Sequence, residues 1–452
     1  MSEFSVRGRR VVVMGGGRSG TAAALLLRDR GADVTLTDVR AEIAEGPRLR
    51  EAGVTLELGY HDSRTLRAAD LIVTSPGIPW RFPLLEDARE AGVPVVGEIE
   101  LASRWLLGPV IAITGTKGKS TTTTLVGRML QSAGMRVEVG GNLGTALSLQ
   151  VPTSTTDSVH VVEVSSFQLE ATDTFHPWIA AILNFSPDHL DRHASVDEYA
   201  AAKQRIFANQ DDRDWTVANF GDPAAVSLAT TSRARRAWFG LDTCPDEGVT
   251  VANGAICYVT PSSRSPLIPL TAVRLIGRHL LADVVAAAAI ARLAGVTADA
   301  MVRAVEGFGG LEHAMELVAD HRGVRFINDS KATNVESARC AIESFDHGLV
   351  PIIGGRFKGG DLRELREPLR ARARAVVAIG EARERVREAL AGVVEVRPAE
   401  SMREAVDQAF ALASPDGIVL LAPACASFDM FVDYAERGRV FKQEVGRIAG
   451  RP

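Results

Sequence analysis

The chain has little of what marks secreted, membrane-bound or nucleic-acid-binding proteins. It has only four cysteines in 452 residues, far apart and without a C-x-x-C pair, so we expect no disulfide framework and a reducing compartment. No apolar run approaches membrane length, and none follows the first residues as in a signal peptide. Lys and Arg are dispersed and the net charge is only -5, which leaves no basic patch. We therefore expect a cytoplasmic protein that binds neither membrane nor nucleic acid.

What the chain does have is the composition of an ordinary globular protein. The hydrophobic fraction of 46% and the charged fraction of 24% allow an ample core, and the length suggests roughly three domains. Three segments, residues 1–98, 99–310 and 311–452, each alternate short apolar strands with helices. This pattern predicts an α/β protein with a Rossmann-like first domain, a central parallel sheet of the P-loop ATPase type and a Rossmann-like last domain.

The most informative stretch is ITGTKGKST at residues 113–121, which follows an apolar strand at 110–113 and precedes a predicted helix at 121–130. A loop in this context directs backbone N–H groups at phosphate, while Lys119 adds a charge and the Ser120 hydroxyl can ligate magnesium. We expect a nucleoside triphosphate here, although an ordinary Gly/Ser/Thr turn is the alternative. The predicted contact residues are Gly115, Thr116, Lys117, Gly118, Lys119, Ser120 and Thr121.

The first segment carries a second glycine-rich turn. Residues 15–20 satisfy G-x-G-x-x-G after a strand at 10–14, and Asp38 ends the next strand, where a ribose-binding acid is expected. This geometry can hold a dinucleotide or any other nucleotide pyrophosphate. A strand at 71–74 leads into Ser75–Pro79, which is either part of a ligand site at the sheet edge or a plain surface loop.

In the central segment, polar residues follow two more strands. Glu163 ends a strand at 159–162, and the loop Asn184–Asp191, which contains His189, follows a strand at 179–183. Carboxyl ends of parallel strands share one sheet edge, so both side chains should lie beside the triphosphate. Ser120 and Glu163 suffice for one magnesium ion, whereas His189 alone is more typical of a hydrogen-bonding loop residue.

Lys203 lies in a predicted helix at 196–207, four residues after Tyr199 and four before Phe207. Periodicity alone favours a surface lysine whose stem covers the aromatic side chains. If the side chain is buried instead, its pKa falls and a neutral amine becomes available for chemistry.

The last segment repeats a strand followed by a polar loop three times, at 328–334, 354–360 and 422–429. Two lysines, a threonine and a serine on these loops predict a site for an anionic small molecule that carries carboxylates. Solvated loop lysines are the alternative.

Seven motifs together resemble the Mur ligase family over essentially the whole chain: ITGTKGKSTTTT, VEVSSFQLE, NFSPDHLDRH, YAAAKQRIF, NDSKATN, GGRFKGGD and APACASFDMF. NDSKATN and APACAS resemble the members that add D-glutamate to UDP-N-acetylmuramoyl-L-alanine. The resemblance implies three domains, for the UDP-sugar, for ATP and for the amino acid, and an amide formed through an acyl phosphate. We also expect a monomer.

The resemblance also implies roles for individual residues. In the catalytic set, Lys119 binds phosphate, Ser120 and Glu163 bind a first magnesium ion, and His189 with carbamoylated Lys203 binds a second. The expected substrate-binding residues of the first two segments are Gly17, Arg18, Ser19, Asp38, Arg40, Ser75, Gly77 and Asn142. The expected glutamate-binding and catalytic positions of the third are Asp329, Lys331, Thr333, Lys358, Ser427, Phe428 and Tyr434, with Lys331 and Lys358 in catalytic roles.

The chain departs from the family pattern at four positions. Lys117, Leu280 and Asp283 replace asparagines, and Ala314 replaces an arginine. Asp283 stays an expected ATP contact, but a carboxylate only accepts hydrogen bonds, so weaker base selectivity is predicted. Four other functions remain open: an L-glutamate-adding muramyl ligase, a folylpolyglutamate synthase-like ligase, a nicotinamide-dependent dehydrogenase and a non-catalytic nucleotide-binding regulator.

Overall fold

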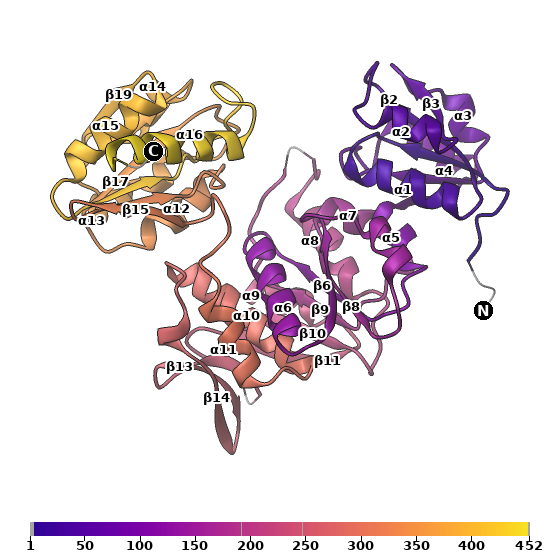
Figure 1. Ribbon diagram of the computed structural model, residues 1–452, viewed down its shortest axis with the longest axis horizontal. Helices are drawn as coiled ribbons and strands as arrows, with labels where there is room; N and C mark the ends of the chain where they lie inside the picture. Colours follow the sequence, from indigo (N-terminus) through magenta and orange to yellow (C-terminus); the bar gives the residue numbers. More distant parts are fainter. Residues whose placement is uncertain (1–3, 191, 246, 451–452) are drawn as a thin grey trace. The chain divides into compact units, whose positions relative to one another are not determined.

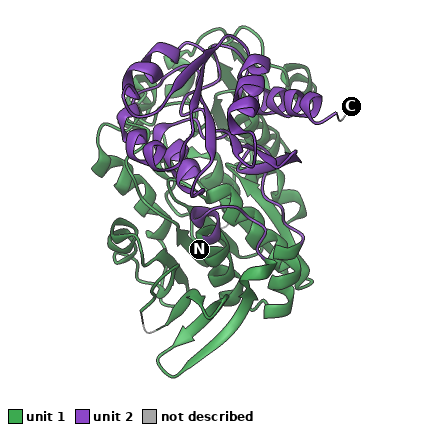
Figure 2. Cartoon of the chain, turned by 90° about the vertical axis from the view of Figure 1, so that its left-hand side faces the viewer, with its two compact units in different colours: residues 1–272, 282–306 green, residues 273–281, 307–452 purple. Residues whose placement is uncertain are grey.

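The computed structural model describes residues 4–190, 192–245 and 247–450. Asp191, the last residue of the predicted His189 loop, lies outside the described residues. The chain divides into two compact units (Figure 2): unit 1 holds residues 1–272 and 282–306, and unit 2 holds residues 273–281 and 307–452. Three sheets with covering helices make up the α/β fold, two of them in unit 1 and one in unit 2.

The first sheet is entirely parallel, with strand order β3-β2-β1-β4-β5, and is drawn in indigo in Figure 1. Its strands are β1 Arg10–Met14, β2 Asp33–Asp38, β3 Thr55–Leu58, β4 Leu71–Thr74 and β5 Val95–Gly97; its helices are α1 Arg18–Asp29, α2 Gly46–Glu51, α3 Ser63–Arg67, α4 Pro83–Glu90 and α5 Glu98–Ser103. The strand order reverses between β1 and β4, which is where ligands bind in such sheets. There the Ser75 hydroxyl donates to the carbonyl of Gly15 at 2.9 Å and joins the two loops.

The second sheet has nine strands in the order β14-β13-β12-β11-β10-β9-β6-β8-β7. Its strands are β6 Val110–Thr114, β7 Arg136–Gly141, β8 Ser158–Glu163, β9 Ile179–Ile182, β10 Trp215–Asn219, β11 Arg235–Gly240, β12 Gly248–Ala252, β13 Ala255–Thr260 and β14 Ser263–Pro269. Its helices are α6 Lys119–Ser132, α7 Ser166–Glu170, α8 Val196–Gln204, α9 Pro223–Ala229, α10 Arg278–Leu293 and α11 Ala298–Glu306. The sheet is parallel from β7 to β12, as the sequence predicts, and an antiparallel extension of β13 and β14 is added.

Short 3-10 helices occur at Leu147–Leu149, Val151–Thr153, Arg205–Phe207 and Leu270–Ala272. Two predicted helix boundaries need correction. The helix after the phosphate loop begins at Lys119 rather than at residue 121, because Gly118 takes a left-handed conformation and serves as its N-cap. The helix of Lys203 ends at Gln204 and continues as a 3-10 turn to Phe207.

The third sheet, in unit 2, has the order β15-β16-β20-β17-β18-β19, and only β15 is antiparallel to its neighbour. Its strands are β15 Glu316–His321, β16 Val324–Asn328, β17 Leu349–Gly354, β18 Val376–Ile379, β19 Val396–Ala399 and β20 Ile418–Leu421; its helices are α12 Val335–Glu343, α13 Arg366–Arg372, α14 Arg383–Ala389, α15 Met402–Ala413 and α16 Tyr434–Ile448, with a 3-10 helix at Leu362–Leu365.

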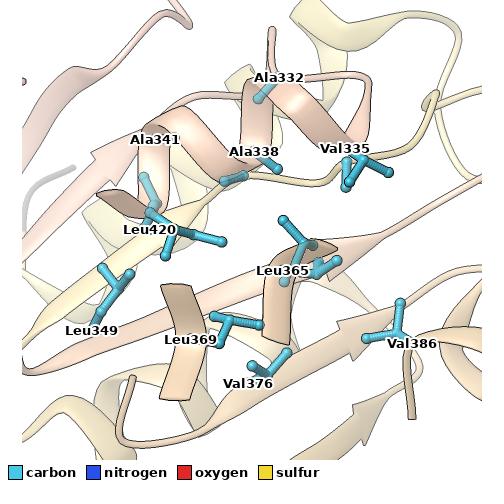
Figure 3. Close-up of a cluster of buried hydrophobic side chains, with 14 of the residues drawn as sticks. Ala332, Val335, Ala338, Ala341, Leu349, Leu365, Leu369, Val376, Val386 and Leu420 are labelled. Carbon is cyan, nitrogen blue, oxygen red and sulfur yellow. The ribbon is translucent and has the colours of Figure 1, made fainter. Parts of the chain in front are cut away.

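The core beneath the third sheet's loops is apolar and tightly filled. Ala338 and Ala341 on α12, Leu349 on β17 and Leu420 on β20 are all fully buried and meet in one layer (Figure 3). The small alanine side chains let α12 lie close to the sheet, which fixes the loop at 328–334 just before the helix. Among the described residues, no helix is both long enough and apolar enough to cross a membrane.

Candidate active site

The phosphate loop is held in shape by Asn184, the residue that follows β9 by two positions. Its side-chain oxygen accepts from the backbone N–H groups of Thr116 and Lys117 at 3.1 and 2.9 Å. Its amide nitrogen donates to the Lys117 carbonyl at 3.1 Å. Asn184 stands at a predicted strand end, and no role was predicted for it from the sequence. The structure shows that it braces the loop.

Gly118 is needed for both its backbone conformation and its missing side chain. Its φ is +79°, and a Cβ added there would lie 2.0 Å from Oδ1 of Asp283. Asp283 is buried, with 5% of its surface exposed. The carboxylate predicted to contact ATP therefore lies directly against the phosphate loop.

Lys119, Ser120 and Thr121 form the first turn of α6, so the helix N-terminus faces the space that the loop encloses. The Lys119 amine donates to the carbonyls of Gly115 and Thr116, both at 3.0 Å.

Glu163 ends β8 and is buried, with 2% exposed. Its Oε1 accepts from the side-chain amide of Asn142 at 2.7 Å. Within the part of the chain that the structure describes, its buried Oε2 has no hydrogen-bond partner. A buried carboxylate oxygen without a donor is costly, and a hard divalent cation is a suitable partner for it. The donor set thus fits the expected magnesium ion.

Lys203 is buried, with only 1% exposed, so the surface position favoured by periodicity alone is wrong. Its amine donates to the Gly115 carbonyl at 2.9 Å and lies 4.7 Å from the centre of the Tyr199 ring. Burial, and next the nearby charge of Lys119, hold the pKa of Lys203 well below its usual range. A shift in this direction favours the neutral form of the amine.

His189 has a φ of 54°, and its side chain is half exposed on the loop after β9. Its ring lies edge-on to Phe167, with centroids 5.0 Å apart. The Arg192 guanidinium lies 4.5 Å from the Phe167 ring centre, and its Nη2 donates to the Pro76 carbonyl at 3.2 Å. The loop that carries His189 is thereby tied to the loop after β4.

A cavity of about 380 Å³ opens where the first sheet meets the turn after β7, and we call it the N-terminal cavity. All eight substrate-binding residues expected in the first two segments line it: Gly17, Arg18, Ser19, Asp38, Arg40, Ser75, Gly77 and Asn142. His61 and Gln168 line it too but were missed. His61 follows β3 by three residues, so its place after a strand end could have indicated it. Gln168 lies within the motif VEVSSFQLE.

Asp38 is already engaged by the protein. Its carboxylate accepts from the Gly16 N–H at 2.6 Å and from the Arg40 guanidinium at 2.7 and 2.9 Å. The hydrogen bond from Arg40 holds the pKa of Asp38 well below its usual range. Asp38 thus braces the glycine-rich turn in its ionised form, besides facing the cavity.

In unit 2, the predicted residues lie on three loops. Asp329 and Ser427 are buried, Lys331 and Thr333 are partly buried, and Lys358, Phe428 and Tyr434 are exposed. Asp329 Oδ1 accepts from the Met315 N–H at 3.2 Å, and the Lys331 N–H donates to the His313 carbonyl at 3.0 Å.

Arg437, which the sequence analysis missed, joins two of these loops. It is 1% exposed and donates to the Ser330 hydroxyl at 2.9 Å, the Ser330 carbonyl at 2.8 Å and the Cys425 carbonyl at 3.1 Å. Burial lowers its pKa to about 10. An arginine in the first turn of a helix reads as a surface residue, so no local signal indicated its role. Leu280, one of the departures, packs in the apolar core of unit 2.

Known proteins resemble this chain over nearly its whole length. Residues 9–97 match the family model described as Mur ligase MurD-like, N-terminal domain; residues 113–291 match the Mur ligase middle domain; and residues 314–425 match the Mur ligase, glutamate ligase domain. A protein of Acidobacterium capsulatum is 46% identical over 447 residues, covering 98% of this chain and 97% of its own. The chain belongs to the Mur ligase family. The resemblance carried by the seven motifs is confirmed.

Curated relatives carry one shared name, and solved structures share the fold of the chain. The Acidobacterium protein and one of Koribacter versatilis, 43% identical over 99% of both chains, are both named UDP-N-acetylmuramoylalanine--D-glutamate ligase. The fold is that of a pseudomurein peptide ligase type C from Methanothermus fervidus (TM-score 0.62, 17% identity, 98% of this chain and 100% of that one). It is also that of the UDP-N-acetylmuramate-alanine ligase MurC from Thermotoga maritima (TM-score 0.61, 19% identity, 97% and 100%). The three-domain Mur ligase fold predicted from the sequence is confirmed.

Proposed function

We propose that this protein is an ATP-dependent ligase that joins D-glutamate to UDP-N-acetylmuramoyl-L-alanine in cytoplasmic peptidoglycan precursor synthesis. The observation that carries the proposal is the N-terminal cavity, which gathers all eight expected nucleotide-sugar residues and includes Asn142, the hydrogen-bond partner of Glu163. A relative of that name, 46% identical over nearly its whole length, supports the same reaction. We assign residues 1–98 to the UDP-sugar, 99–310 to ATP and 311–452 to glutamate, in a monomer.

The phosphate loop is the proposed site of the ATP phosphates. Backbone N–H groups at the start of α6 and the Lys119 amine supply positive potential where the triphosphate charge gathers. Asn184 keeps the loop in this shape. The resulting alignment lets the substrate carboxylate approach the γ-phosphorus in line with the leaving oxygen.

Glu163 and Ser120 are the proposed ligands of one magnesium ion, and His189 with carbamoylated Lys203 those of a second. Such ions, when bound, neutralise charge on phosphate oxygens. The carbamate forms when the neutral Lys203 amine attacks carbon dioxide: a nitrogen–carbon bond forms, one proton is released and the product is an anion. The depressed pKa of Lys203 supports this step.

The loops of unit 2 are the proposed glutamate site. Lys331 and Lys358 supply cations for the two glutamate carboxylates, with Thr333 and Ser427 as hydroxyl partners, and exposed Phe428 and Tyr434 flank them. In the reaction, the substrate carboxylate attacks the γ-phosphorus and ADP leaves. The free glutamate amine then attacks the acyl carbon, phosphate leaves with the electrons of the broken carbon–oxygen bond, and the nitrogen releases one proton as the amide forms.

The test is phosphate release from magnesium-ATP with UDP-N-acetylmuramoyl-L-alanine and D-glutamate, L-glutamate or no amino acid, with the product mass checked. Release and a glutamyl adduct with D-glutamate alone are expected, and Lys119→Ala is expected to abolish both. Equal or better use of L-glutamate would replace the proposal with an L-glutamate-adding ligase. Activity on a reduced folate in place of the nucleotide sugar would replace it with a folylpolyglutamate-type ligase. No release under any condition would overturn it.

A further inference from the structure

We propose that Asn142 is a positioning residue that fixes the Glu163 carboxylate for a divalent cation and couples cation affinity to occupancy of the N-terminal cavity. The inference rests on the proposed function for the identity of the nucleotide sugar, while the contacts that carry it are independent of the reaction. Asn142 lies in the turn after β7, 21 residues before Glu163 in the chain.

Asn142 contacts Glu163 through both its backbone and its side chain. Its backbone N–H donates to the Glu163 carbonyl at 2.9 Å, and its side-chain Nδ2 donates to Oε1 at 2.7 Å. One hydrogen bond fixes where the turn lies, and the other fixes how the carboxylate is rotated. A carboxylate held through one oxygen presents the other in a defined direction, which is how residues outside the ligand set orient metal ligands.

The turn cannot easily move away from Glu163. Gly141 has a φ of +95°, and a Cβ there would lie 2.4 Å from the Glu163 carbonyl oxygen. Gly140 is equally close to its surroundings, since its Cβ would lie 2.2 Å from the Thr145 carbonyl oxygen. The backbone just before Asn142 is therefore packed closely, and the Asn142 amide is held against the carboxylate.

The Glu163 oxygen that accepts no hydrogen bond from Asn142, Oε2, is the one that is available to a ligand. Oε2 is buried, and no described residue donates to it. If Asn142 were absent, the carboxylate could rotate and both oxygens would compete for the remaining space. Asn142 thus reserves Oε2 for the cation.

The same turn forms one wall of the N-terminal cavity. Gly141, Asn142 and Gly144 line it, and Arg18 from the glycine-rich turn donates through Nη1 to the Gly144 carbonyl at 3.2 Å. A ligand that fills the cavity touches the element that orients Glu163. Because binding coupling is reciprocal, the nucleotide sugar should tighten the cation, and the cation should tighten the nucleotide sugar by the same factor.

The experiment measures Mn²⁺ affinity by electron paramagnetic resonance in the presence of a non-hydrolysable ATP analogue, with and without UDP-N-acetylmuramoyl-L-alanine. Asn142→Ala is expected to weaken Mn²⁺ by about 10- to 100-fold and to remove the tightening caused by the nucleotide sugar. Asn209→Ala is the matched control, because the Asn209 side-chain amide likewise donates hydrogen bonds, to the carbonyls of Asp173 and Phe175, and Asn209 is not among the residues that line the N-terminal cavity. It should leave Mn²⁺ affinity and its coupling unchanged at saturating nucleotide sugar.

The inference is overturned if Asn142→Ala retains wild-type Mn²⁺ affinity. It is also overturned if the variant loses Mn²⁺ affinity but the nucleotide sugar still tightens Mn²⁺ by the full wild-type factor. If the alanine variant does not fold, Asn142→Ser replaces it, because a serine hydroxyl is too short to reach Oε1. The Mn²⁺ measurement without nucleotide sugar needs neither glutamate nor turnover. A wild-type protein that forms no glutamyl product therefore contradicts the proposed function without affecting this part of the test.

Discussion

The amines of Lys203 and Lys119 both donate to the single backbone carbonyl of Gly115, at 2.9 and 3.0 Å. Two lysines on one acceptor repel each other when both are charged, and Lys203 is the more deeply buried of the two. The pair therefore favours the neutral form of Lys203. Converting Lys203 to an anionic carbamate would turn this repulsion into attraction.

Lys203→Ala should lower ligase turnover by about 100-fold or more, because the buried amine and its carbamate are both lost. A short carboxylate such as acetate should restore part of the activity by occupying the vacated space. Labelled bicarbonate should give a carbamate carbon signal by nuclear magnetic resonance in the wild type and none in the variant. Full activity of Lys203→Ala without any added carboxylate would contradict the carbamate assignment.

Glu163→Gln should abolish most of the ligase activity. The free energy of unfolding of the ligand-free variant should nevertheless equal that of the wild type or exceed it, by about 1 kcal/mol or more. The reason is that the wild-type carboxylate keeps Oε2 buried without a donor, whereas an amide carries no charge to desolvate. Urea denaturation in the presence of a chelator measures the stability difference. A variant clearly less stable than wild type under these conditions would show that Oε2 is well satisfied in the free protein.

Gly118→Ala should raise the KM for ATP at least tenfold and destabilise the protein by roughly 1–3 kcal/mol, because the new Cβ collides with Asp283. Gly134→Ala separates the collision from backbone strain. Gly134 has nearly the same φ, +81°, but nothing lies within 4 Å of its added Cβ. Gly134→Ala should cost only the strain, about 1 kcal/mol, and leave the KM for ATP unchanged. Equal effects at both sites would mean that Asp283 moves aside at no cost.

Stability should fall in acid partly through His160, which is fully buried between Ser154 and Gln150 with hydrogen bonds of 2.8 Å to each. Burial lowers its pKa from 6.5 to about 4. Between these values the unfolded chain binds a proton that the folded protein does not, so the contribution is complete above pH 6.5 and is lost as the pH falls toward 4. The loss from pH 7.5 to pH 5 should be about 2 kcal/mol.

The comparison of wild type with His160→Gln isolates this contribution, because every other titrating group is shared. Chemical denaturation at pH 7.5 and pH 5 should show a shallower acid loss in the variant by about 2 kcal/mol. Equal losses in the two proteins would show that His160 accepts a proton in the fold without penalty.

Local patterns predicted most of the fold, because strands such as β4 and β20 are short apolar runs bounded by polar residues and turn formers. They also predicted which loops gather around the N-terminal cavity, since parallel strands end at a common edge. The position of Lys203 could not be predicted in this way. A spacing of four residues places it on one helix face with Tyr199 and Phe207, but the spacing does not reveal what covers that face. The motif resemblance implied a carbamoylated Lys203, which needs the neutral amine of the buried alternative.

Contacts between residues that lie far apart in the chain could not be predicted from the sequence. Arg437 and Ser330 are separated by 107 positions, and Asn142 and Glu163 by 21. Each residue alone looks like an ordinary polar group of a loop or helix start. The Asn142–Glu163 contact follows from the register of β7 against β8, and the Arg437–Ser330 contact follows from how α16 packs against the loop after β16. No periodicity within one segment encodes either contact.

Asn184 affects both the rate and the entropy of nucleotide binding. Because its amide already holds the Thr116 and Lys117 peptide groups, the loop loses less conformational entropy when the triphosphate binds. Association should then follow a single phase, with only a small contribution of loop ordering to the calorimetric binding entropy. In Asn184→Ala the phosphate loop should be ordered only when the nucleotide binds. The binding entropy should then be less favourable, and the approach to binding equilibrium slower.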